Sequence, residues 1–335
     1  MMMKVMMHRH LEKAQAGRSY GAHVSQHVLV TGGAGFIGSH LVDRIIARGD
    51  RVTVLDDLSS GRREFLAHHE GALTFVEVDL CNLDAILPHF ESVDLVIHLA
   101  ANPDIRLGTR VTDTDLRNGT VATYNVLEAM RRHDVQRIAF ASSSVVYGEG
   151  APMPTPESHG PLLPISLYGA SKLAGEALIS AWVGTFGFQG WIFRFANIVG
   201  ARTTHGVTYD FVHKLRTDPS RLEVLGNGRQ EKSYMDVGDC ADAFLHCIDT
   251  MDDRINLVNL GSVDTCSVTR IAEIVIEAMG LDASIEYTGG DRGWAGDIPR
   301  ARLAIERLQA SGFSVEHDSE ASILGTVRWL LEEQA

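Results

Sequence analysis

The chain has 335 residues, enough for one large domain or two smaller ones, and its 45% hydrophobic and 22% charged residues are ordinary for a soluble globular protein. Its formal net charge of −13 argues against a nucleic-acid partner, because binding a phosphate backbone requires clustered Lys and Arg. No stretch approaches the roughly 18 apolar residues that span a bilayer, so no membrane association is expected.

The first 26 residues lack the apolar core of a secretory signal and are predicted to form a disordered N-terminal extension. His8 and His10 are better explained as residues of a solvated tail than as metal ligands, and no metal site is expected. The four cysteines show no CxxC spacing, which indicates free thiols in a reducing compartment. We therefore expect a cytoplasmic protein.

From residue 27 onward, short apolar runs alternate with amphipathic stretches. Strands are expected at 27–32, 51–57, 73–80, 93–101, 135–144 and 190–200, and helices at 36–49, 115–133 and 169–185. Strands rich in Val, Ile and Leu that are separated by helices predict a parallel sheet covered on both faces. The fold class is therefore α/β, with a Rossmann-type doubly wound sheet.

After residue 200 this regular alternation weakens. Helices are expected at 237–251, 267–280 and 322–335, and a further strand at 255–261. Ser267 and Gly280 are the expected N-cap and C-terminal stop of the middle helix. The pattern predicts a dinucleotide-binding domain of residues 27–200, to which 236–261 cross back. A smaller, interleaved C-terminal substrate lobe is predicted to comprise residues 201–235 and 262–335.

A glycine-rich loop, TGGAGFIG (31–38), joins the first strand to the first helix. Gly32 permits the tight turn, Gly35 lets the backbone approach a pyrophosphate, and Gly38 allows close packing of helix and strand. The helix that starts with Phe36 and Ile37 then offers free N–H groups and a positive dipole to the phosphates.

Asp56 ends the second strand, where a carboxylate can accept hydrogen bonds from both adenosine ribose hydroxyls. It would repel a 2′-phosphate, so NAD is favoured over NADP as the cofactor. Helix capping by Asp56 or Asp57 is the alternative, and the nearby Arg62 and Arg63 keep the preference open. Asp79 and Leu80 end the third strand, where such folds line the adenine pocket.

Tyr168 and Lys172 stand four residues apart in YGASK, on one face of a predicted helix. A phenol with a pKa near 10 is no base at neutral pH, and lowering that pKa by about three units takes roughly 4 kcal/mol. A neighbouring ammonium and a positive nicotinamide ring both favour the phenolate. The pair could consist of two exposed residues without a function, but it follows a complete dinucleotide loop, which favours a catalytic role.

Several motifs now occur in the order of a known family: TGGAGFIG, HLAA (98–101), NGT (118–120), SSSVVYG (142–148), YGASK (168–172) and RFANIVG (194–200). On these motifs the chain, over residues 27–335, resembles the extended short-chain dehydrogenase/reductase family, and within it the NAD-dependent nucleotide-sugar epimerases and dehydratases. The resemblance implies a nucleotide-sugar substrate. It also implies a homodimer formed through helices 115–133 and 169–185.

The resemblance also implies roles for individual residues. Ser143 matches the hydroxyl that hydrogen-bonds the sugar 4-hydroxyl, Tyr168 matches the base, and Lys172 matches its activator, which also holds the nicotinamide ribose. Ala100 and Asn118, within the HLAA and NGT motifs, join the cofactor-binding residues.

On the substrate side, the resemblance assigns Asn197 to the substrate phosphate. It assigns Lys232 and Arg292 to the diphosphate as cations. Here the sequence departs from the family pattern, since Lys232 stands where an Arg is usual. Arg292 lies a residue or two away from its usual position, and Ile198 stands where a Pro is frequent.

The two residues after Ser143 bear on the reaction. In the related 4,6-dehydratases these positions hold Asp and Glu, which transfer protons, whereas here they are Ser144 and Val145. The sequence therefore favours epimerisation over dehydration. The resemblance then implies C4 epimerisation of a UDP-sugar of the glucose or galactose type through a transient 4-keto sugar. A dehydratase, a 4-keto reductase and a non-catalytic NAD(H)-binding module remain alternatives.

Two histidine-containing stretches outside these motifs are expected to be solvated helix surface. They are His68-His69 and the run RRH at 131–133.

Overall fold

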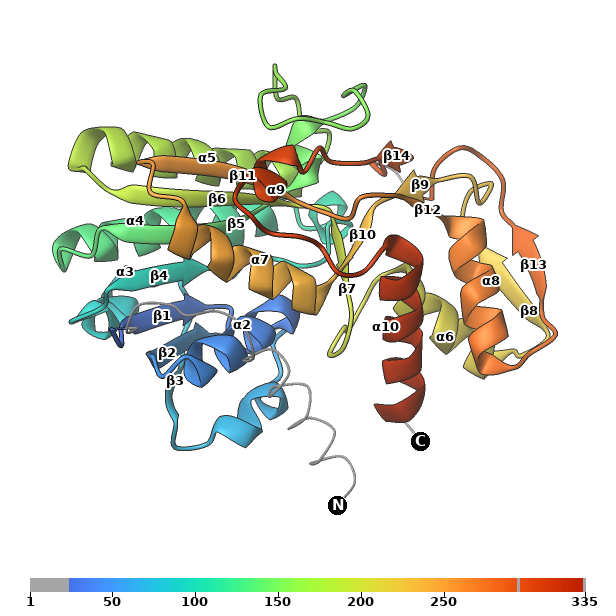
Figure 1. Cartoon of the computed structure of the whole chain (residues 1–335), viewed down its shortest axis with the longest axis horizontal. Helices are drawn as coiled ribbons and strands as arrows, with labels where there is room; N and C mark the ends of the chain where they lie inside the picture. The colour runs from blue at the N-terminus through green and yellow to red at the C-terminus, as the bar shows by residue number, and fades with distance from the viewer. Residues whose placement is uncertain (1–23, 294–295, 334–335) are drawn as a thin grey trace.

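The computed structural model describes residues 24–293 and 296–333, so residues 1–23 of the predicted N-terminal extension lie outside it. Its centre is a seven-stranded parallel sheet with the strand order β11-β6-β5-β4-β1-β2-β3 (Figure 1). The strands are β1 (His27–Thr31), β2 (Arg51–Asp56), β3 (Leu73–Glu77), β4 (Leu95–His98), β5 (Arg137–Ser143), β6 (Gln189–Phe195) and β11 (Ile255–Leu260). The predicted Rossmann-type fold class is confirmed.

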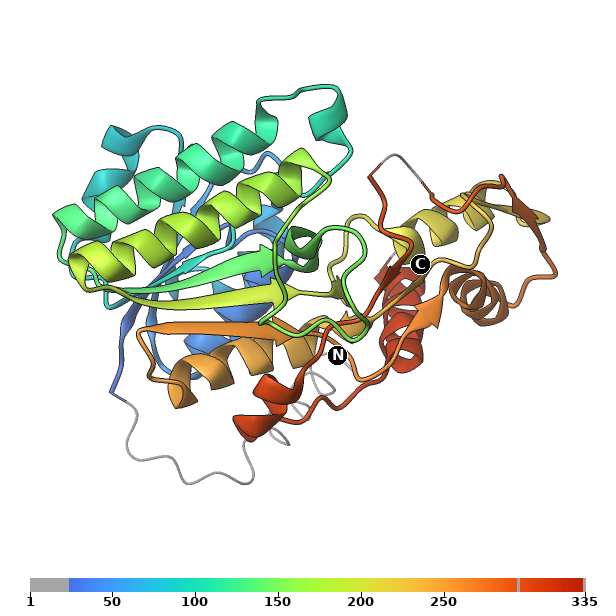
Figure 2. The same cartoon turned by 90° about the horizontal axis from the view of Figure 1, so that it is seen from above.

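Helices cover both faces of this sheet, as the continuous apolar strands require. Figure 2 shows α4 (Ala122–Arg132) and α5 (Leu167–Phe186) side by side on one face. On the other face α2 (Phe36–Ala47) packs beside α7 (Val237–Thr250). Every residue of β1 is buried, because side chains on either side of the strand enter one of two apolar cores.

Most predicted boundaries shift by a few residues, and three elements differ more from the structure. The predicted strand 190–200 breaks at Ala196, after which β7 (Asn197–Val199) leaves the main sheet and pairs with β10 (Tyr234–Asp236). The predicted strand 73–80 ends at Glu77, because the chain turns as the Asp79 carboxylate accepts a hydrogen bond from the Cys81 N–H. The predicted helix 115–133 begins as a π-helix over Leu116–Val121 before α4 starts.

The C-terminal part of the chain forms a lobe with its own apolar core. In it α6 (Val207–Thr217) and α8 (Val268–Met279) pack on β8 (Arg221–Val224), which pairs with β13 (Ser284–Tyr287). The last helix, α10 (Ser319–Glu333), packs against α6, α8 and β10. As predicted, the Ser267 hydroxyl caps α8 by accepting from the Arg270 N–H, and Gly280 ends it in the left-handed conformation.

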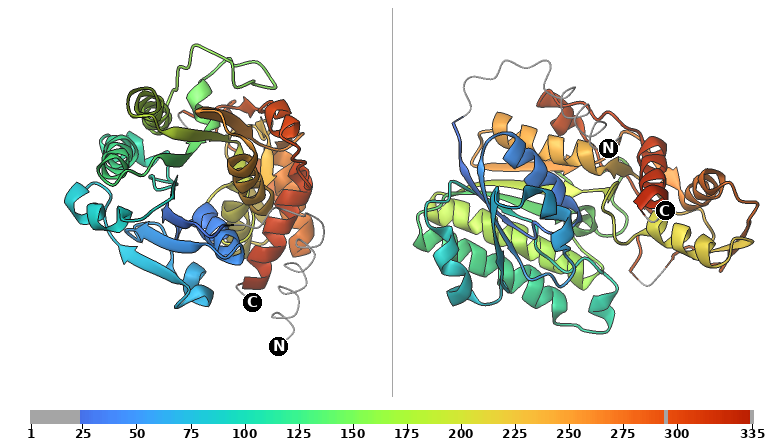
Figure 3. Two further views of the ribbon diagram at one scale, coloured as in Figure 1. Left: turned by 60° about the vertical axis from the view of Figure 1, so that its left-hand side comes forward. Right: turned by 90° about the horizontal axis from the view of Figure 1, so that it is seen from below.

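The lobe stands beyond the carboxyl ends of the central strands (Figures 1 and 2). Figure 3 shows the same arrangement from two further sides, with α10 beside the main domain. The remaining short elements are β9 (Glu231–Lys232), β12 (Cys266–Ser267), β14 (Arg300–Ala301), α3 (Leu83–Ile86) and α9 (Glu306–Ala310).

The cysteines are all unpaired, as expected, although Cys81 is only partly buried while Cys240, Cys247 and Cys266 are buried. Among the described residues, none of the helices has the length and apolar character needed to cross a bilayer.

Candidate active site

The glycine loop follows β1, the strand from which the chain first adds strands on one side of the sheet and then on the other. Strands β2 and β3 follow β1 on one side, whereas β4 lies on its other side and leads on to β5 and β6. Dinucleotides bind at such a switch point, outside the carboxyl ends of the strands. Gly32 follows β1 with φ +69°, and a Cβ there would lie 2.8 Å from the backbone nitrogen of Ala100, which follows β4. Gly32 and Ala100 therefore meet at the crevice.

A buried histidine holds β1 and β4 together at this point. His98 places Nδ1 2.7 Å from the Thr31 hydroxyl and Nε2 2.9 Å from the Thr123 hydroxyl. Burial lowers the pKa of His98 to about 3, and the charge of Lys172 acts in the same direction. The imidazole is therefore neutral and serves as a spacer between the strands and α4.

The start of α2 is shaped to receive a pyrophosphate. A Cβ on Gly38 would lie 2.1 Å from the Gly32 carbonyl oxygen, so only glycine lets the helix approach the loop so closely. Gly35 is the N-cap and provides no side-chain cap, and the first turn, from Phe36 through Ile37, has no acidic residue. Unpartnered N–H groups and the positive helix end then remain available to phosphate, which fits the diphosphate of NAD.

Asp56 is buried and holds the loop in shape. Its Oδ2 accepts a hydrogen bond of 2.9 Å from the Ala34 N–H, and its Oδ1 accepts one of 2.9 Å from the Leu58 N–H. Burial raises the pKa of Asp56, while these two bonds oppose the rise. Asp57 instead accepts from Ser59, so neither carboxylate caps a helix. Each oxygen of Asp56 keeps a further lone pair for a ribose hydroxyl.

The predicted adenine-side residues lie close together. Asp79 is exposed, whereas Leu80 is buried and its carbonyl accepts a hydrogen bond of 2.8 Å from the Asn125 side chain. Asn118 is exposed on the π-helix, and its Oδ1 lies 3.9 Å from the Cys81 thiol. Asn118 therefore stands beside the turn that follows β3, a position its motif alone does not specify.

The three consecutive serines have different surroundings. Ser142 is buried and donates to the Glu176 carboxylate, which also pairs with Arg194 through two hydrogen bonds of 2.9 and 2.6 Å. Ser143, the last residue of β5, is close enough to the Tyr168 phenol to act on its pKa. Ser144 begins the 3-10 helix that follows. Of the three serines, Ser143 is thus the one that acts on the tyrosine.

Lys172 is buried one helical turn after Tyr168. Its Nζ donates a hydrogen bond of 2.7 Å to the Ala141 carbonyl of β5 and lies 5.7 Å from the centroid of the Tyr168 ring. Burial lowers the pKa of Lys172 to about 8, against the opposing effect of Asp115 and Glu176. The ammonium is thus fixed against the tyrosine ring by the end of the strand.

The protein alone raises the pKa of the tyrosine. Burial raises the pKa of Tyr168 to about 12, the Asp115 carboxylate adds to the rise, and Ser143 only partly opposes it. The phenol is therefore protonated in the protein alone. A positive charge close to the phenol would favour the phenolate.

Asp115 is a site residue that sequence reasoning missed. It is 2% exposed, its Oδ1 accepts a hydrogen bond of 3.1 Å from the Asn102 side chain, and its Oδ2 is buried without a partner. Its charge acts on both Tyr168 and Lys172. No motif signals it, since the buried turn before the π-helix becomes visible only in the fold.

The three predicted phosphate-binding residues gather around Ser233 and Asp297. The Asn197 side chain donates a hydrogen bond of 3.2 Å to the Ser233 carbonyl, next to Lys232. Lys232 Nζ lies 2.6 Å from Asp297 Oδ1, and Arg292 Nη1 donates to the Asp297 carbonyl at 3.1 Å. Sequence reasoning did not foresee the buried Asp297, which neutralises Lys232.

Arg292 also links the lobe to the sheet domain. Its guanidinium forms an ion pair with Glu149, which follows the 3-10 helix of Ser144–Tyr147. The substrate end of the candidate site is therefore built against the segment that extends from Ser143.

Comparisons with known proteins agree with this geometry. The model of the NAD dependent epimerase/dehydratase family matches residues 28–261. A putative UDP-glucose 4-epimerase of Methanocaldococcus jannaschii is 33% identical over 311 residues, which cover 90% of this chain and 98% of that protein. A crystal structure of UDP-galactose 4-epimerase is 39% identical with a TM-score of 0.84, covering 92% of this chain and 100% of the other.

Relatives of other activity are also found. UDP-glucuronic acid decarboxylase 4 of Arabidopsis thaliana is 32% identical over 270 residues, which cover 78% of this chain and 59% of that protein. The relatives therefore share the family with this chain while their printed activities differ. The chain belongs to the NAD dependent epimerase/dehydratase family, and its cofactor is NAD.

Proposed function

We propose that this protein interconverts the C4 epimers of a UDP-sugar of the glucose and galactose type. The observation on which the proposal depends is the group Ser143, Tyr168 and Lys172 beside the dinucleotide crevice, with Ser144 and Val145 directly after Ser143. The group can move one proton at a hydroxyl. The following two residues offer no acid and base for an elimination.

The first half of the reaction requires a proton to leave the sugar 4-hydroxyl. Ser143 accepts or donates a hydrogen bond at this hydroxyl, and Tyr168 takes its proton as the base. Lys172, fixed by the Ala141 carbonyl, places a positive charge beside the tyrosine ring. NAD, when bound, supplies the redox chemistry at C4 of the sugar. The sugar product of this half is a 4-keto sugar.

The second half returns the same proton. Tyr168 donates it to the C4 oxygen after the keto sugar has turned its other face to the crevice, so the overall reaction is an isomerisation without net oxidation. Turning requires that the diphosphate stay bound while the sugar moves. Asn197, Lys232 and Arg292 stand where they can hold it, because they lie in or beside the lobe and not on the central strands.

The test is incubation of the purified protein with UDP-glucose, UDP-galactose, their N-acetylamino forms and UDP-glucuronic acid, without added cofactor, followed by NMR. We expect one pair of C4 epimers to interconvert, with no net consumption of NAD(P)H. A stable 4-keto-6-deoxy sugar, a decarboxylated pentose, or a dependence on stoichiometric NAD(P)H would each overturn the proposal.

We further propose that two copies pair through α4 and α5. Both helices expose large apolar side chains, Tyr124 on α4 at 43% and Phe186 on α5 at 45% exposure. Light scattering at micromolar concentration should give the dimer mass, and Tyr124→Asp should shift it toward the monomer. A monomeric wild-type protein would contradict the pairing.

A further inference from the structure

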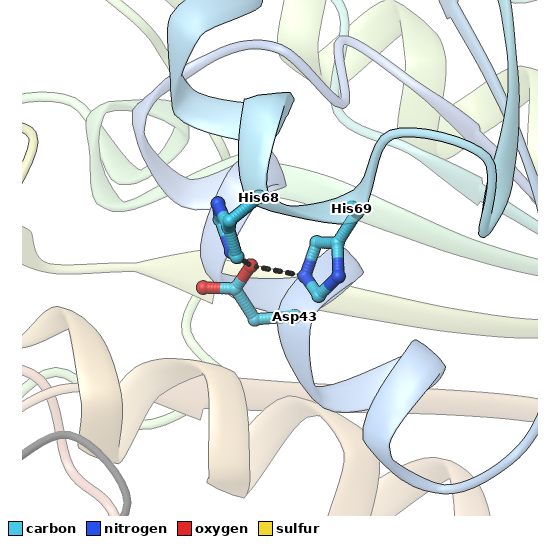
Figure 4. A group of neighbouring side chains, drawn as sticks. All are labelled: Asp43, His68 and His69. Atoms are coloured by element: carbon cyan, nitrogen blue, oxygen red, sulfur yellow. Dashed lines mark hydrogen bonds and ion pairs between the residues drawn. The ribbon is translucent and has the colours of Figure 1, made fainter. Parts of the chain in front are cut away.

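Two adjacent histidines meet one aspartate at a place remote from the glycine loop. Asp43 lies on α2, and His68 and His69 end the 3-10 helix of Arg63–His69 that follows β2. Both histidines place Nε2 2.8 Å from the same oxygen, Asp43 Oδ1, and Figure 4 shows the two rings beside that carboxylate. His68 is exposed on a helical segment, as expected, but the shared contact with Asp43 was not foreseen.

The second oxygen of the aspartate has a partner of its own. Arg202 Nη2 lies 2.8 Å from Asp43 Oδ2, the oxygen that the histidines do not use. Arg202 thus orients the carboxylate from outside, as outer partners of metal ligands commonly do.

We propose that Asp43, His68 and His69 bind a divalent cation of the zinc class, with water completing the coordination. Two imidazoles and one carboxylate suit Zn²⁺ and its transition-metal neighbours, whereas Mg²⁺ and Ca²⁺ prefer oxygen ligands. The three ligand atoms lie within 4.8 Å of one another.

The present arrangement needs little change to admit the ion. Ligands about 2.0–2.2 Å from a tetrahedral zinc stand roughly 3.3 Å apart. Each histidine nitrogen is now 2.8 Å from the carboxylate oxygen, so the group must open by only about half an ångström per contact. Ligation through Nε2 leaves Nδ1 of each imidazole as the nitrogen that carries a proton.

The site is open to solvent and joins two segments that frame the cofactor crevice. The His68 side chain is 40% exposed, which provides a path of entry, whereas that of His69 is 16% exposed. A bound ion would tie α2, which begins at the glycine loop, to the segment after β2. Because an ion that binds only the folded state stabilises it, zinc should raise the melting temperature.

The experiment uses the full chain with His8 and His10 replaced by Ala, since histidines in the N-terminal extension could bind zinc themselves. After chelator treatment and dialysis, titration calorimetry with Zn²⁺ should reveal one saturable site. Co²⁺ should produce the strong visible absorption of a four-coordinate ion. The melting temperature should rise with zinc concentration.

Three variants locate the ion. In the same background, Asp43→Asn, His68→Ala and His69→Ala should each weaken zinc binding by at least about tenfold, since even the loss of an outer partner costs 10–100-fold. His133→Ala, at the end of α4, is the matched control and should leave the affinity unchanged. Circular dichroism in the absence of metal confirms that each variant is folded.

Two results would overturn the proposal. One is the lack of a saturable site in the folded background protein, which needs no further variant to interpret. The other is zinc affinity that persists in the three variants, because the ion would then bind elsewhere.

Discussion

The cofactor edge of the sheet and the phosphate end of the lobe contribute to the candidate site by different physical means. At the edge, Gly32 and Gly38 shape the crevice with backbone alone, because any Cβ would collide with backbone atoms of the neighbouring turn. At the lobe, Lys232 and Arg292 provide charges that are already paired with Asp297 and Glu149.

We therefore expect the cofactor edge to be rigid and the phosphate end of the lobe to be adjustable. Backbone collisions cannot be relieved without moving α2, so a change at the edge should abolish cofactor binding. An ion pair can exchange partners, since Lys has three donors and a diphosphate competes directly with Asp297. Changes at the lobe should therefore tune substrate affinity while leaving the chemistry intact.

The largest effect on turnover is expected for a change of Tyr168, at the cofactor edge of the sheet. Tyr168→Phe removes the proton acceptor and should reduce turnover by about 100- to 10,000-fold, the range that general base catalysis supplies. NAD retention should be unchanged, as measured by absorbance of the nucleotide released on denaturation. Tyr147→Phe is the matched control, because that phenol donates to Asn259 away from the tyrosine–lysine pair. Full activity of Tyr168→Phe would refute the assigned role.

Gly38→Ala tests whether the edge is rigid. The added Cβ, 2.1 Å from the Gly32 carbonyl, should displace α2, cost about 1–3 kcal/mol of unfolding free energy and lose NAD. Gly184→Ala on α5 is the control, because its Cβ would meet nothing within 4 Å and should raise stability by up to about 1 kcal/mol. Denaturant unfolding and bound-nucleotide content provide the two readouts. A Gly38→Ala protein that keeps NAD would show that the edge is adjustable after all.

A smaller effect is expected at the lobe. Lys232→Met should raise KM for the UDP-sugar by about tenfold, the loss of one charge-assisted hydrogen bond, with kcat changed little. Lys214→Met removes an exposed lysine that pairs with Glu223, and should change neither constant. Steady-state kinetics separates the two variants. A collapse of kcat in Lys232→Met would mean that the two ends are not independent.

The smallest effect concerns the pH profile. The Asp115 charge raises the pKa of Tyr168, so Asp115→Asn should lower it. Because the phenolate is the base, activity should increase with pH as Tyr168 loses its proton. In Asp115→Asn the midpoint of this increase should move to a lower pH by about half a unit. The control is Asp113→Asn, because Asp113 is an exposed aspartate two residues before Asp115. An unmoved or upward-shifted midpoint in the kcat/KM profile would exclude electrostatic coupling between Asp115 and Tyr168.

Much of the fold and of the cofactor edge could be predicted because its signals are local. Apolar runs indicated the central strands, and the glycine spacing indicated the turn at Gly32. The spacing of Tyr168 and Lys172 follows from one helical turn. The break of the predicted sixth strand at Ala196 could not be foreseen, since β7 leaves the sheet to pair with β10, which is more than thirty residues away.

The residues that were missed depend on long-range contacts. Asp297 matters only because the fold brings it to Lys232, and Asp115 only because a buried turn places it near Lys172. The adjacent His68 and His69 looked like solvated surface until α2 brought Asp43 to them. Such groups need tertiary structure, because neither periodicity nor motif spacing encodes them.

The most direct test of the proposed reaction follows the hydrogen at C4 of the substrate. A UDP-sugar deuterated at C4 is converted in ordinary water without added cofactor, and the product epimer is analysed by NMR and mass spectrometry. If the C4 hydrogen is removed and returned within the site while Tyr168 handles only the hydroxyl proton, the epimer keeps its deuterium. Replacement of the deuterium by hydrogen from solvent, or the failure of any epimer to form, would contradict the proposed mechanism.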